Sequence, residues 1–145
     1  MTAKADFTEA EWTTVLEGPS SAGMIVMTAA HGGTFKETFA IGKAYAEARQ
    51  QHGDSELLDE IVSAKPQVDH THYHSMEEIQ QHGFQHVRDA VDVLERKATA
   101  EELGDYRRFV MALAERVAEA HREHGVAVSD QEQAALAEIS RSLGE

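Results

Sequence analysis

The chain has 145 residues, a length that fits one domain with a substantial hydrophobic core. Its 26 acidic and 13 basic residues give a formal net charge of -13. Such a field disfavours nucleic acid and anionic membranes as partners, and favours divalent cations or a basic protein. The absence of cysteine excludes disulfides, thiolate metal sites and cysteine nucleophiles. Because no apolar run resembles a signal peptide or is long enough for a bilayer, we expect a cytoplasmic protein.

The capping-box pattern, in which Ser or Thr is followed three residues later by Glu, marks five helix starts. The hydroxyl accepts a hydrogen bond from the third helical amide, and the carboxylate accepts one from the cap amide. The pairs are Thr8 with Glu11, Thr34 with Glu37, Ser75 with Glu78, Thr99 with Glu102, and Ser129 with Glu132. No segment alternates convincingly as a strand. The pattern therefore predicts an all-α fold, a compact single-domain bundle of about seven helices over residues 1–145.

The first predicted helix runs from Thr8 to Glu17. Gly18 can end it in a left-handed conformation, and Pro19 then begins a second helix that runs to about Ala30. Before the first helix, Phe7 stands where it can form a hydrophobic staple with Trp12. The second helix carries no charge and is small or apolar around its whole circumference. We therefore predict that it is the central, buried helix of the bundle.

The remaining helices are predicted from apolar residues at helical spacing and from Gly and Pro at the ends. A polar connection is expected from Gln67 to His74. The predicted helices run from Thr34 to Gln51, from Asp54 or Ser55 to the residue before Pro66, from Ser75 to Lys97, from Thr99 to His124, and from Ser129 to Leu143.

Two segments share one pattern: a helix ends in small residues, the chain turns on glycine, and a capped helix begins. They run from Thr28 to Glu37 near one end and from Ala120 to Glu132 near the other. Over Ala29 to Glu37 and Val126 to Gly144 the chain resembles the TerB-like group of tellurite-resistance proteins, which are small all-helical bacterial domains. The resemblance implies the same fold and a module that binds a partner or a cation.

The resemblance also indicates where a cation would bind. In that family an Asp precedes the glycine of each turn and is a candidate cation ligand, whereas this chain has His31 and His124 there. The exchange disfavours oxygen-seeking ions and favours zinc, nickel or copper. The implied ligands of a divalent transition metal are His31, His121, His124, Glu37 and Glu132. On spacing alone, His121 and His124 are more readily explained as boundary residues that extend the apolar stripe of their helix.

The other histidines offer an alternative metal site. His70, His72 and His74 alternate, so an extended backbone would point all three to one side. Glu78, His82 and His86 are four residues apart and share a helix face. A polar loop rich in histidine and a solvated helix surface explain the two patterns more simply, and the metal site is the alternative.

No catalytic motif is present: Gly32-Gly33 lacks a phosphate-binding context, and Gly-x-Ser-x-Gly does not occur. The sequence therefore favours a non-catalytic binding or interaction module of bacterial stress or metal response. The alternative is a His/carboxylate metal-binding protein or a metal-dependent enzyme. A small-ligand pocket around Trp12, Met24 and Met27 is a third hypothesis, against plain core packing.

Overall fold

The computed structural model describes residues 4–29, 42–43, 45–47, 56–64, 75–122 and 130–144. Every regular element in these ranges is a helix, which confirms the all-α class. Residues 42–43 and 45–47 are also helical, within the range predicted to run from Thr34 to Gln51. The elements are η1 (Lys4–Asp6), α1 (Glu9–Ala29), α3 (Glu56–Ser63), α4 (Met76–Lys97), α5 (Ala100–Arg122) and α6 (Asp130–Ser142).

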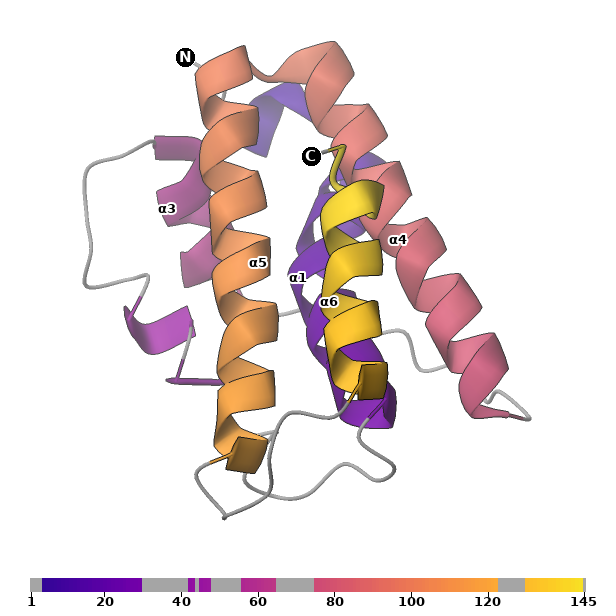
Figure 1. Ribbon diagram of the computed structural model, residues 1–145. Helices are drawn as coiled ribbons and strands as arrows, with labels where there is room; N and C mark the ends of the chain where they lie inside the picture. Colours follow the sequence, from indigo (N-terminus) through magenta and orange to yellow (C-terminus); the bar gives the residue numbers. More distant parts are fainter. Residues whose placement is uncertain are drawn as a thin grey trace.

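The helix α1 lies at the centre of the bundle and packs against α4, α5 and α6 (Figure 1). The helices α1 and α5 run in one direction, and α4 and α6 run in the other (Figure 1). The short α3 packs on the outer side of α5. None of the helices in the described ranges combines the length and the apolar character that crossing a bilayer requires.

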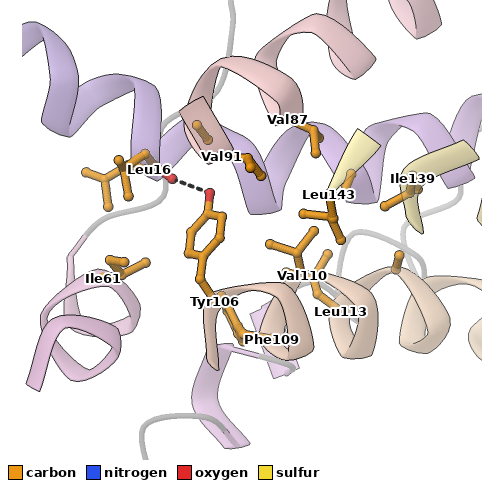
Figure 2. Packing of buried hydrophobic residues seen from close by; sticks show 14 of the residues in the cluster. Leu16, Ile61, Val87, Val91, Tyr106, Phe109, Val110, Leu113, Ile139 and Leu143 are labelled. Carbon is orange, nitrogen blue, oxygen red and sulfur yellow. Dashed lines mark hydrogen bonds between the residues drawn. The ribbon is translucent and has the colours of Figure 1, made fainter. Parts of the chain in front are cut away.

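The first two predicted helices are one continuous helix, α1, and the predicted break at Gly18 is wrong. Pro19 lies inside α1, where it has no N–H to donate to the carbonyl of Val15 one turn earlier. The hydroxyl of Tyr106 on α5 donates a hydrogen bond to that carbonyl instead, with an O–O distance of 2.7 Å (Figure 2). The helix passes through the proline because a side chain from another helix replaces the missing donor.

Gly18 makes room for this replacement. A Cβ atom at this buried position would overlap the hydroxyl oxygen of Tyr106. Gly18 is therefore needed for close approach of a side chain, and it does not act as the helix terminator that its position before Pro19 suggested.

The prediction of a buried central helix is confirmed over residues 20–26 of α1, the part after Pro19 whose side chains the structure describes. Ala22, Ile25 and Val26 are fully buried, and Met24, at 36% exposure, is the exception. On α4, Gly83 lets α1 approach closely, because a Cβ atom there would lie 2.8 Å from Cγ1 of Ile25. The absence of a side chain at Gly83 thus lets α1 and α4 pack closely at Ile25.

Three of the predicted helix starts have the expected cap. The Thr8–Glu11 box is complete, with hydrogen bonds of 2.9 and 3.1 Å, and the Thr99–Glu102 box repeats these values. At the start of α4, Ser75 accepts a hydrogen bond from the amide of Glu78 at 3.1 Å. Thr34 and Ser129 lie outside the described residues. The predicted staple also forms, with the rings of Phe7 and Trp12 5.6 Å apart.

The remaining described elements follow the prediction closely. The bounds of α4, α5 and α6 lie within one or two residues of those predicted, and α3 occupies most of its predicted range. Within the range predicted for the third helix, Tyr45 is buried edge-on against Phe109, with ring centroids 5.2 Å apart, whereas Gly42 is exposed. The predicted connection from Gln67 to His74 lies outside the described residues.

The core lies between α1, α4, α5 and α6. Figure 2 shows the ring of Tyr106 crossing from α5 toward α1 among aliphatic side chains of these helices. The aliphatic residues come from α4, α5 and α6 and include Val87, Val91, Val110, Leu113, Ile139 and Leu143. The core therefore surrounds the buried hydroxyl of Tyr106, which donates to the backbone of α1.

Candidate functional site

His86, one of the predicted metal ligands, pairs with a carboxylate on another helix. Its Nδ1 lies 3.2 Å from Oε2 of Glu17 on α1, and both side chains are about three-quarters buried, with exposures of 25% and 22%. The pair joins α1 and α4 beside their close contact at Gly83. His86 thus has a structural partner that its helical spacing with Glu78 and His82 did not indicate.

The alternative set Glu78, His82 and His86 forms no metal centre in this geometry. His82 is exposed and Glu78 is half-buried on α4. Across the ranges that the structure describes, no three His, Asp or Glu side chains group as metal ligands would. His70, His72 and His74 lie outside those ranges.

The described helix ends that are nearest in sequence to His31, His124 and Glu132 lie at one end of the bundle. The last turn of α1, the last turn of α5 and the first turn of α6 all lie at the lower end in Figure 1. Of the ligands implied by the family resemblance, only the side chain of Glu132 is described. His31, Glu37 and His124 are outside the described residues, as is the side chain of His121, so their convergence stays a prediction.

Glu132 is almost completely buried, at 1% exposure, in the first turn of α6. A carboxylate at this position is favoured by the positive end of the helix dipole and is where a capping box would place it.

Two further buried carboxylates lie in the first half of α5, and sequence reasoning did not single them out as a site. Glu102 is held by its capping box with Thr99. Asp105, at 4% exposure, receives a hydrogen bond on Oδ1 from Arg108, while Oδ2 has no hydrogen-bond donor among the described residues. The only sequence pattern that pointed to this pair is the three-residue spacing of Asp105 and Arg108 on one helix. The same spacing is common on solvated helix surfaces, so it did not indicate burial.

Tyr106 is a further buried titratable group. Burial, with a smaller contribution from nearby Tyr45, raises the pKa of Tyr106 well above 10.0. Its hydroxyl therefore stays protonated in ordinary buffers and remains a donor to Val15. A tyrosinate nucleophile or base at this position is disfavoured.

Several basic side chains are already engaged inside the chain. Lys97, in the last turn of α4, contacts Oε1 of Glu11 at 2.7 Å and the carbonyl of Asp6 at 3.0 Å. The Lys97 ammonium, with help from the Thr8 amide, lowers the pKa of Glu11 from 4.5 to about 2. The other described pairs of Arg with a carboxylate are Arg107–Glu95, Arg108–Asp105, Arg116–Glu47 and Arg141–Glu138.

The hypothesis of a ligand pocket shared by Trp12 and Met24 does not fit the described residues. The two are twelve positions apart on α1, a separation of roughly 18 Å along a helix. Trp12 is buried in the staple with Phe7, and Met24 is exposed. The side chain of Met27 lies outside the described part of the chain.

Comparison with models of protein families, with curated proteins and with solved structures gives no match for this chain. The TerB-like resemblance therefore stays a prediction that rests on the two glycine turns.

Proposed function

We propose that this chain is a non-catalytic binding module of bacterial stress or metal response, located in the cytoplasm, which recognises a basic protein surface. The observation that carries the proposal is the distribution of charge. Each ion pair inside the chain removes one charge of each sign, so the formal excess of -13 is undiminished. Among the described residues only Glu102, Asp105 and Glu132 are buried carboxylates.

The other carboxylates that the structure describes are therefore exposed or half-buried. On α5, for example, Glu115 and Glu119 are both exposed and one helical turn apart. A surface of this kind attracts a basic partner over roughly 10 Å at 0.1 M salt, and repels the phosphates of nucleic acid. Affinity for a basic partner should consequently fall steeply as salt is added.

The test is affinity purification from the cells that produce the protein, followed by measurement of the dissociation constant for each purified partner at several salt concentrations. We expect a basic partner whose affinity falls at least about tenfold between roughly 0.05 and 0.5 M salt. A partner whose affinity does not change with salt would contradict charge-based recognition.

A charge series identifies the face that is used. Replacing Glu115 and Glu119 first by Gln and then by Lys changes the net charge in two equal steps. The Gln variant is the matched control, because it keeps the side-chain shape and removes only the charge. If α5 is the binding face, the association rate should fall stepwise across the series.

The metal-binding alternative has its own readout. Elemental analysis of protein purified without a histidine tag or a nickel column should find no stoichiometric zinc, nickel, copper or manganese. If a metal is found at one equivalent, and its removal lowers the melting temperature, the chain is a metal-binding protein of the kind implied by His31 and His124.

A further inference from the structure

The backbone of α1 has a gap at Pro19. One of the hydrogen bonds that would cross from the second part of the helix to the first is missing, and its acceptor is the carbonyl of the fully buried Val15. The donor that replaces it belongs to Tyr106, a residue on α5 that is 91 positions away in sequence. The continuity of α1 thus depends on a side chain that is not part of it.

The two parts of α1 are held by different contacts. The part before Pro19 is fixed by the Thr8 cap, by the Phe7–Trp12 staple and by Lys97 at the end of α4. The part after Pro19 packs through Ile25 against Gly83 in the first half of α4. Each part can therefore keep its own contacts while the other opens.

We propose that Pro19 divides α1 into two units that open separately, and that the Tyr106 hydroxyl is the latch that couples them. When the latch is intact, the Val15 carbonyl is satisfied and the unit after Pro19 opens only slightly more often than the rest of the bundle. Without it, a buried acceptor is left unsatisfied at the joint, and the unit after Pro19 opens more often than the rest of the bundle.

The test is amide hydrogen exchange, measured by NMR on the full chain, with the amides of residues 20–26 compared with those of residues 87–94 on α4. In Tyr106→Phe, protection of residues 20–26 should fall at least about tenfold more than protection of residues 87–94. Equal loss in both segments would overturn the proposal, because it would show that α1 opens only with the whole fold.

Two further variants make the result specific. Pro19→Ala restores the backbone donor to Val15, so Tyr106→Phe in that background should no longer separate the two segments. A separation that persists would show that the hydroxyl does not act at the joint. Tyr45→Phe removes another buried phenolic hydroxyl from the same core and should lower protection in both segments alike.

A variant of Tyr106 that fails to fold does not leave the proposal untested. Pro19→Ala alone should raise protection of residues 20–26 more than that of residues 87–94, because it adds a backbone bond at the joint. No difference between the segments in this variant would overturn the proposal on its own.

Discussion

Replacing Gly18 by Ala tests whether the approach of Tyr106 to α1 is as close as the structure shows. In an ordinary helix interior this substitution stabilises by up to about 1 kcal/mol. Here the new methyl group would overlap the Tyr106 hydroxyl, and the next atoms are Cβ of Ala90 at 3.2 Å and Cζ of the tyrosine ring at 3.3 Å. The ring must move, and its hydrogen bond to Val15 is lost.

The magnitude follows from these contacts. An unsatisfied buried carbonyl costs about 1–3 kcal/mol, and overpacking costs about 1–3 kcal/mol more. With the helix-propensity gain subtracted, we expect Gly18→Ala to lower the free energy of unfolding by about 3 kcal/mol. In a Tyr106→Phe background the overlapping oxygen is already absent, so the same substitution should change stability by less than about 1 kcal/mol.

Urea unfolding followed by circular dichroism measures the four free energies of this double-mutant cycle. The matched control is Gly104→Ala on α5, where a Cβ atom would meet only Nη1 of Arg108 at 3.8 Å, and which should be neutral or stabilising. If the effects of Gly18→Ala and Tyr106→Phe add within about 0.5 kcal/mol, the two groups do not compete for one space and the reasoning fails.

Two other predictions concern charged contacts. The pKa of Glu11 is lowered from 4.5 to about 2, so its contribution to stability is fully present above pH 4.5 and is lost as the pH falls toward 2. In Lys97→Met this pH dependence of the unfolding free energy should become weaker, and an unchanged acid titration would count against the contact. Arg107 donates from Nε to the carbonyl of Leu143 at 2.6 Å, at the end of α6. Arg107→Ala should lower the free energy of unfolding by about 1–2 kcal/mol, whereas Arg141→Ala, an exposed neighbour, should change it by less than about 0.5 kcal/mol in the same urea titration. Equal effects of the two would show that Arg107 does not cap α6.

The features that could be predicted from the sequence are those that depend on near neighbours. A capping box involves residues three apart, so Thr8 and Thr99 were assigned correctly from the pattern alone. The error at Gly18-Pro19 has the opposite origin, since the donor that lets α1 continue is on another helix. No local pattern distinguishes a proline that ends a helix from one whose lost bond is replaced by a distant side chain.

Prediction of the candidate site from the sequence is limited in the same way, because its contacts also come from distant parts of the chain. Helical spacing predicted that Glu78, His82 and His86 share one face, and all three do lie on the continuous helix α4. The spacing could not show that His86 pairs with Glu17 on α1. The burial of Asp105 was likewise not visible in the sequence, because it is set by what packs over α5. Periodicity therefore predicted the helices well and the partners of polar side chains poorly.

The place of Trp12 has a practical consequence for optical experiments. It is the only tryptophan, and it is buried against Phe7, with Nζ of Lys4 5.9 Å from its ring centroid, at the beginning of α1. Its fluorescence thus reports on the amino-terminal edge of the bundle alone. An emission curve whose midpoint lies at a higher temperature than the midpoint of the ellipticity curve would reveal melting that starts elsewhere, with no added label.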